Sequence, residues 1–205
     1  MSETTVEPGA FALSLIRTNA LDEAAHHAAH DGARDRGQAP GNWSMYQDLT
    51  KTLETWKAAG TLREDGLLTI ERLLVDLVVY RFQALGEDKG KLDRWMSDFG
   101  DQVCRSQRHA HPAGPTAVTL MSVVTEDVGP GRWQNDGVRV AQLAVPYQGY
   151  VRPDQELEDT RELILTLGLW AGQFLASLMH YERDRITGYL DSRAVKVDGA
   201  DEGTR

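Results

Sequence analysis

The chain has 205 residues, of which 41% are hydrophobic and 26% are charged. That composition is enough for a buried core and excludes wholesale disorder. Acidic residues outnumber Lys plus Arg by 31 to 22, giving a net charge of −9. Because nucleic acids and anionic membrane surfaces recruit basic faces, this balance disfavours both as direct partners.

The predicted organisation is a single, mainly helical domain over residues 10–195, flanked by flexible tails at 1–9 and 196–205. Leucine and aromatic residues recur at three- and four-residue intervals in its first half, which is typical of helices with one buried face. The helices predicted from this spacing cover 10–34, 43–59, 65–85 and 91–108.

The helical spacing of apolar residues then ends, and an insertion over 109–153 is expected. The segments 116–125 and 138–145 are short and rich in β-branched residues, so they are predicted as the two strands of a β-hairpin. A long helical region over 154–190 follows, either as one helix or with a kink at Gly168 and Gly172. The predicted fold is therefore a mainly α bundle of about five helices, with a hairpin insertion before a long C-terminal helix.

The segment 163–179 is uncharged and contains Gly168-x-x-x-Gly172, a spacing that lets helices approach closely in membranes. Its length is at the lower limit for a span and Gln173 adds polarity, so a buried core helix is favoured over a membrane helix. With a single cysteine, Cys104, no intrachain disulfide can form. The N-terminus lacks the basic region of a signal peptide, and a cytoplasmic location is expected.

A metal site is one hypothesis, because Asp22, His26 and His30 fall on one face of the first predicted helix. A carboxylate with two imidazoles one turn apart suits zinc or another divalent cation. The competing interpretation, an exposed polar face on an alanine-rich helix, is favoured, and no cofactor is otherwise indicated. Cys104 is expected to be a buried, inert thiol.

Two further features concern charge. Asp76 lies among apolar residues one helical turn after Arg72, and an ion pair between them is favoured over a catalytic base. The densest acidic cluster follows the predicted hairpin and comprises Asp154, Glu156, Glu158, Asp159 and Glu162.

The strongest prediction of a binding site falls on the hairpin loop and the stretch after the hairpin. Tryptophan, tyrosine and arginine are enriched at interaction hot spots, and function is often carried by loops on a rigid scaffold. The predicted partner-binding residues are Arg132, Trp133, Tyr147, Tyr150 and Arg152.

No phosphate-binding loop, dinucleotide-binding glycine motif or serine-hydrolase motif is found, so an enzyme is not favoured. The predicted function is a non-enzymatic, acidic interaction or assembly subunit of an intracellular complex, binding a protein partner or further copies of itself. One alternative is a small helical metal- or ligand-binding protein or enzyme that uses the His26/His30 face. The other is an acidic inhibitor or immunity-like protein that binds a basic partner.

Overall fold

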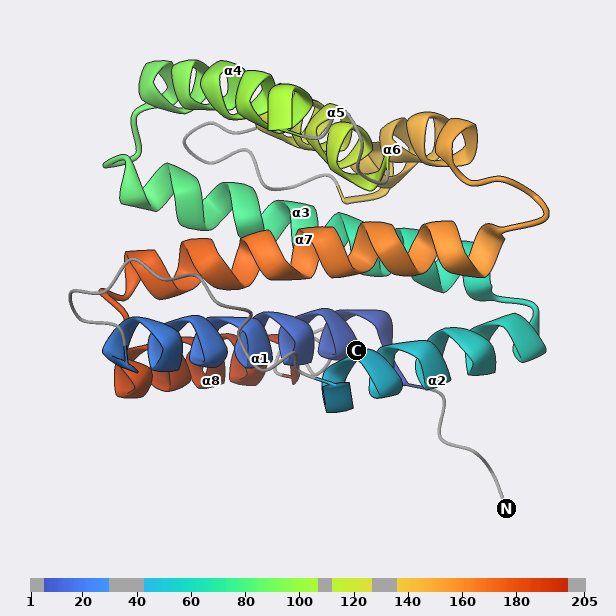
Figure 1. Ribbon diagram of the computed structural model, residues 1–205, viewed down its shortest axis with the longest axis horizontal. Coiled ribbons are helices and arrows are strands. Elements are labelled where there is room, and N and C mark those ends of the chain that lie inside the picture. The colour runs from blue at the N-terminus through green and yellow to red at the C-terminus, as the bar shows by residue number, and fades with distance from the viewer. Residues whose placement is uncertain (1–5, 30–42, 107–111, 127–135, 199–205) are drawn as a thin grey trace, which may run out of the picture.

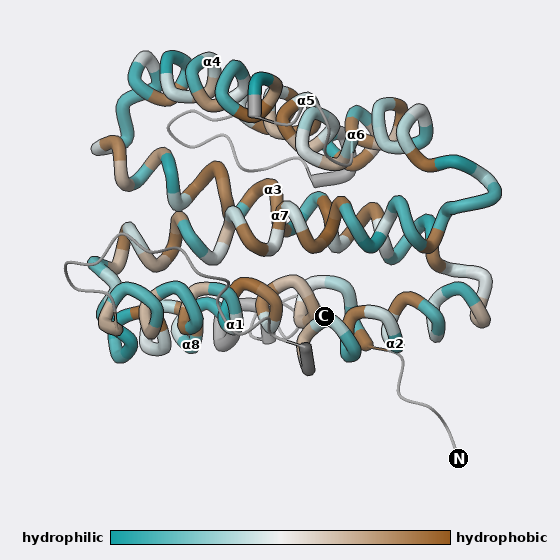
Figure 2. The backbone as a smooth tube through the Cα atoms, viewed as in Figure 1, coloured by the Kyte–Doolittle hydropathy of each residue, from teal (hydrophilic) through white to brown (hydrophobic). Residues whose placement is uncertain are grey.

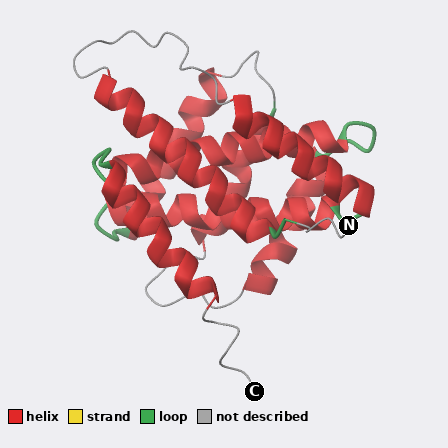
Figure 3. Cartoon of the chain, turned by 90° about the horizontal axis from the view of Figure 1, so that it is seen from below, coloured by secondary structure: helices red, strands yellow, loops and turns green. Residues whose placement is uncertain are grey.

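The computed structural model describes residues 6–29, 43–106, 112–126 and 136–198. Within those ranges the chain forms helices joined by short turns, and no strand is present (Figure 3). The helices are α1 (Pro8–Ala29), α2 (Trp43–Ala59), α3 (Leu62–Ala84), α4 (Lys89–Ser106), α5 (Ala113–Glu126), α6 (Asp136–Tyr150), α7 (Glu156–Leu178) and α8 (Arg183–Asp198).

The helices lie in three layers, with α3 and α7 in the middle one (Figure 1). The layer formed by α4, α5 and α6 lies on one side, and α1, α2 and α8 lie on the other. Helix α7 packs most extensively against α1 and α3. Apolar residues are concentrated along this middle layer, whereas the outward turns of α4 are hydrophilic (Figure 2).

The predicted β-hairpin is wrong, since 116–125 lies inside α5 and 138–145 lies inside α6. The β-branched residues that suggested strands are compatible with a helix here because the buried positions of α5 follow helical spacing. These positions include Ala117, Leu120, Met121 and Val124. The Thr125 hydroxyl also donates to the Met121 carbonyl one turn earlier, a bond that lets threonine fit within a helix.

Helix α6 buries Arg139, Leu143 and Tyr147, which are four residues apart. This spacing places all three on one face of the helix. The Arg139 guanidinium lies 2.6 Å from Glu71 on α3, so α6 is fastened to the middle layer by a largely buried ion pair. Pro146 lies in the last turns of α6 without ending it.

The predicted long C-terminal helix is two helices, bent by 115° at the turn between Leu178 and Arg183. The break does not occur at Gly168 or Gly172, which lie inside α7. It occurs at His180 and Tyr181, whose φ angles are 56° and 61°. Two successive left-handed residues other than glycine reverse the chain there, and that conformation is costly without support from neighbouring contacts.

No single helix in the described ranges is long and apolar enough to cross a membrane; only α7 taken together with α8, across their bend, passes such a test of length and composition. Gly168 and Gly172 face α1. The Gly-x-x-x-Gly spacing therefore serves a close helix crossing inside this fold, where α7 meets α1.

Candidate interaction surface

Helices α4 and α7 bring together four partly buried aromatic side chains, which border an exposed leucine and an arginine from α3. We call this set the α4–α7 aromatic surface. Its members are Trp95 and Phe99 on α4, Leu169, Trp170 and Phe174 on α7, and Arg81 on α3.

The sequence of α4 explains why its two aromatic rings lie at the edge of the core. Leu92, Met96 and Val103 form the buried stripe of this helix. Trp95 and Phe99 lie one turn apart beside that stripe, so their rings stack with centroids 5.1 Å apart and planes at 21°. When the apolar face of a helix is wider than the area that its neighbours cover, the uncovered apolar residues lie at the surface.

The two aromatic residues of α7 meet those of α4 edge to face. Phe99 lies 4.9 Å from Trp170 with ring planes at 82°, and Trp95 lies 5.4 Å from Phe174 with planes at 81°. Such T-shaped pairs are favoured over face-to-face stacking by the ring quadrupoles. The four rings therefore form one continuous cluster across two helices.

Arg81 approaches this cluster from the end of α3. Its guanidinium carbon lies 5.0 Å from the centroid of the Trp95 ring and 5.8 Å from that of Phe174. Burial lowers the pKa of the guanidinium, and its Nε is buried without a hydrogen-bond acceptor. The aromatic faces compensate the charge in part through cation–π attraction.

Leu169 extends the apolar character of this region onto the outward stripe of α7. Its side chain is 45% exposed. Leu165 lies one turn earlier on the same stripe and is only partly buried. Leu165 packs against the core, so Leu169 is the exposed large apolar residue of α7, next in sequence to Trp170 of the aromatic cluster. Apolar exposure beside partly buried aromatic rings is a property expected of a binding face.

The structure does not gather the predicted partner-binding residues into one site. Arg132 and Trp133 lie outside the described residues. Tyr147 is fully buried, and its hydroxyl is 2.8 Å from the Thr160 hydroxyl on α7. Burial raises the pKa of the Tyr147 hydroxyl. Tyr147 therefore joins α6 to α7 and is not available to a partner.

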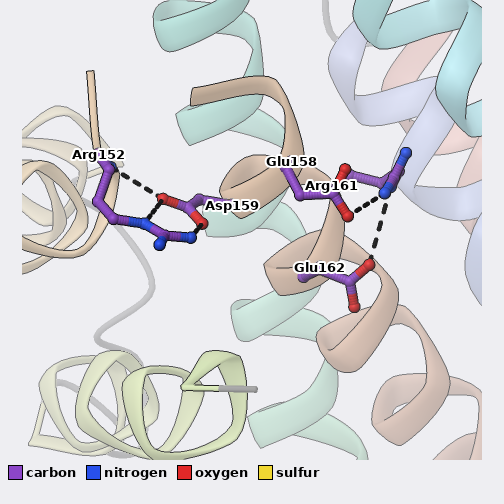
Figure 4. A network of polar contacts seen from close by, with 5 residues as sticks. All are labelled: Arg152, Glu158, Asp159, Arg161 and Glu162. Atoms are coloured by element: carbon purple, nitrogen blue, oxygen red, sulfur yellow. Dashed lines mark hydrogen bonds and ion pairs between the residues drawn. The ribbon is translucent and has the colours of Figure 1, made fainter. Parts of the chain in front are cut away.

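Arg152 is committed to a carboxylate of the same chain (Figure 4). Its Nε and Nη2 donate to Asp159 at 3.0 and 2.6 Å, and its backbone N–H donates to the same carboxylate at 2.9 Å. The hydrogen bond to Asp159 raises the pKa of Arg152. Because Asp159 is buried on α7, this clamp fixes the turn between α6 and α7.

Tyr150 and Arg152 do line a shallow groove between the start of α5 and the end of α6. Its volume is about 510 Å³, and its other lining residues are Pro112 just before α5, Thr116 and Thr119 on α5, and Pro146 and Gly149 on α6. Burial raises the pKa of the Tyr150 hydroxyl. Two of the five predicted residues thus share a surface, at the far end of α6 from Asp136.

The predicted metal residues are only partly placed. His30 lies outside the described residues, while Asp22 and His26 lie on α1. Within the described ranges, no group of three or more His, Cys, Asp or Glu side chains is arranged to hold a metal. His27 stacks on Tyr181 with ring centroids 3.9 Å apart, joining the end of α1 to the turn before α8.

Cys104 is exposed, so the prediction of a buried thiol is wrong. Its neighbour Val103 takes the buried position instead, because a one-residue step on a helix turns the side chain by about 100°. His109 and His111, which follow Cys104 in the sequence and are the residue types that pair with a cysteine in metal binding or catalysis, lie outside the described residues.

The acidic cluster is largely neutralised within the chain. Figure 4 shows Arg161 between Glu158 and Glu162 and shows Asp159 held by Arg152. Glu156 lies 2.9 Å from Arg63 on α3. Arg161 also covers the Tyr46 ring at 5.0 Å, so these charges join α7 to its neighbours.

The predicted Arg72–Asp76 pair is confirmed, with 3.0 Å between Arg72 Nε and Asp76 Oδ2. Arg193 on α8 adds a second cation, 2.7 Å from Asp76 Oδ1, although this contact lacks hydrogen-bond geometry. Burial alone would lower the pKa of Arg193, but Asp76, Tyr80 and Tyr189 together raise it. Asp76 is fully buried and serves to attach α8 to α3.

A second surface groove of about 470 Å³ lies between α1 and α2. Phe11 and Trp56 form part of its wall and pack edge to face at 5.7 Å. Asp48 and Lys51 also line it, and neither has an ion-pair partner among the described residues.

The α4–α7 aromatic surface was missed because its residues look like core residues in the sequence. Trp95 and Phe99 share the spacing of the buried residues of α4, and Trp170 and Phe174 share that of α7. One available signal was the apolar face of α4, which is wider than a single stripe needs.

The described chain defines an all-α protein. No protein-family model matches it, and no significant match to a curated protein or to a solved structure was found.

Proposed function

We propose that this protein is a non-enzymatic helical interaction subunit that binds a protein partner through the α4–α7 aromatic surface. The observation that carries the proposal is the cluster of four partly buried rings, with the exposed Leu169 next to Trp170 in the sequence and the Arg81 guanidinium over the Trp95 and Phe174 rings. Tryptophan and arginine are the residue types on which binding energy concentrates.

One of the two alternatives from the sequence has less support than this role. The inhibitor hypothesis relied on the acidic cluster, but four of its five carboxylates have cationic partners within the chain. The aromatic surface, by contrast, has rings that are only partly buried and an arginine without an ion-pair partner among the described residues.

The test replaces Leu169 with the photo-crosslinking amino acid p-benzoylphenylalanine, in the full-length chain expressed in its own cells. The matched control carries the same residue at Val145 on α6, which is 74% exposed and apolar but lies outside the surface. Irradiation is expected to give a discrete adduct from position 169 and not from position 145. Trp170→Ala introduced alongside should reduce the adduct.

Purified Trp170→Ala protein must keep its helical circular dichroism and cooperative melting for this comparison. Equal adduct patterns from positions 169 and 145, or no adduct from position 169, would reject the proposed function. Mass spectrometry of the adduct also distinguishes a different protein from a second copy of this chain.

A second candidate function, small-ligand binding, is favoured by the groove between α1 and α2. The unpaired Asp48 and Lys51 present opposite charges beside Phe11 and Trp56, which suits a small zwitterion with an apolar side chain, such as phenylalanine. We expect phenylalanine to shift the Trp56 indole resonance and expect Asp48→Ala with Lys51→Ala to remove the shift. No shift at millimolar ligand would exclude this function.

A further inference from the structure

Arg81 differs from the other partly buried arginines in having no carboxylate partner. Each of the others that the structure describes forms an ion pair: Arg17 with Asp191, Arg72 with Asp76, Arg139 with Glu71, Arg161 with Glu158, and Arg193 with Asp76. Arg94 and Arg183 also lack a partner, but their side chains are exposed to water. Arg81 thus combines partial burial with an unpaired charge.

This arrangement is unusual because the chain has a large excess of carboxylates, 31 against 22 Lys plus Arg. A guanidinium taken from water normally needs a carboxylate to offset its lost hydration. The Arg81 guanidinium lies over the Trp95 and Phe174 rings, and its Nε has no acceptor. Arg161 and Arg193 also lie near aromatic rings, but each of them has a carboxylate partner as well.

The position of Arg81 in the last turn of α3 has a simpler partial explanation. A cation there interacts favourably with the negative end of the helix dipole. An arginine whose side chain extended into water would interact with the helix dipole equally well. It does not account for a guanidinium held over the Trp95 and Phe174 rings.

We propose that the partner bound by the α4–α7 aromatic surface supplies a carboxylate to Arg81, from a protein segment whose flanking apolar side chains contact Leu169 and Trp170. This inference rests on the proposed function and specifies the chemistry of the partner. An acidic side chain between apolar ones complements a cation that lies over partly buried aromatic rings, and a carboxylate accepts two parallel N–H bonds from one guanidinium.

The experiment uses the full chain with p-benzoylphenylalanine at position 169 and measures the yield of the partner adduct. Arg81→Gln is expected to lower that yield about tenfold or more, because a charge-assisted hydrogen bond is lost. Arg81→Lys should keep part of the yield, since the charge remains, and Arg81→Glu should abolish it. Arg94→Gln on α4 is the matched control and should leave the yield unchanged.

Two further measurements separate this effect from damage to the fold. Thermal melting of each purified variant reports whether the surface is intact. Mass spectrometry of the adduct locates the cross-linked segment, and changing its Asp or Glu to Lys is expected to restore the adduct with Arg81→Glu. This exchange of charges does not depend on the stability of Arg81→Gln.

An adduct that is formed equally well by Arg81→Gln and Arg81→Glu would overturn the inference and leave the proposed function standing. A cross-linked segment without any acidic residue would do the same. The absence of an adduct from the unsubstituted surface would reject the proposed function itself, so the two failures are distinguishable.

Discussion

Gly172 on α7 lies so close to Asn19 on α1 that a β-carbon added to the glycine would fall 2.4 Å from Asn19 Cβ. The same β-carbon would lie 2.8 Å from the backbone nitrogen of Ala20. Backbone atoms cannot move away as a flexible side chain can. The crossing of α1 and α7, which contributes much of the core, therefore requires the absence of a side chain at position 172.

Gly172→Ala is expected to destabilise the protein by about 3 kcal/mol or more, because the added methyl forces two packed helices apart. Gly168→Ala is the matched control one turn earlier, since its β-carbon would meet Leu15 and Asn19 side-chain atoms at 3.6 Å, an ordinary contact. Helix propensity should make that change neutral or stabilising by up to about 1 kcal/mol. Urea unfolding followed by circular dichroism measures both, and equal losses would contradict the crossing geometry.

Much of the fold can be predicted from the sequence where periodicity is clean. The prediction of a helix over 43–59 matches α2, because Leu49, Leu53 and Trp56 form one fully buried stripe. The strand prediction over 116–125 is wrong, although β-branched residues dominate that segment, because it forms part of α5. Strand propensity is a weak local preference, and burial of one helical face of α5 outweighs it.

The interaction surface could be predicted only in pieces. The stacking of Trp95 on Phe99 follows from their i, i+4 spacing. Their meeting with Trp170 and Phe174 depends on how α4 packs beside α7, which local sequence does not specify. Whether Arg81 has an ion-pair partner depends on all of its neighbours in the folded structure, so it cannot be predicted from a sequence pattern.

Removing the hydroxyl is expected to have opposite effects on stability at two buried tyrosines. The Tyr147 hydroxyl is bonded to Thr160 at 2.8 Å, whereas the Tyr80 hydroxyl is buried without a partner. Tyr147→Phe should cost about 1 kcal/mol, and Tyr80→Phe should be neutral or stabilising by about 1 kcal/mol. Chemical denaturation at pH 7 distinguishes them; a clear loss for Tyr80→Phe would show that its hydroxyl has a partner in solution.

Deprotonation of the same two tyrosines is expected to lower the free energy of unfolding at alkaline pH. Burial raises the pKa of Tyr80 well above 10.0, and the charge of Asp76 adds to the effect. Because the folded pKa exceeds the unfolded one, the stabilisation is complete below pH 10 and is lost as pH rises above it. The free energy of unfolding falls by about 1.4 kcal/mol per pH unit for each such group.

Tyr80→Phe should therefore reduce the steepness with which the free energy of unfolding falls above pH 10. Below pH 9 the variant and the wild-type chain should show the same dependence on pH. Urea unfolding at half-unit intervals from pH 8 to 11 measures this. Tyr46→Phe provides a control, since the Tyr46 ring is only partly buried beneath Arg161. Parallel curves for wild type and Tyr80→Phe would contradict the assignment.

Arg152 was predicted from the sequence to bind a partner, and the structure gives it a different role that substitution can test. Arg152→Ala should cost about 3 kcal/mol, because it leaves the buried carboxylate of Asp159 without its guanidinium partner. Asp159→Ala should cost less, since water can solvate the exposed Arg152 guanidinium and the main loss is the acceptor of the Arg152 backbone N–H. If both variants keep full cross-linking from position 169 once folded, Arg152 acts on the α6–α7 turn alone; a selective loss of the adduct in folded Arg152→Ala would instead place it in the interface.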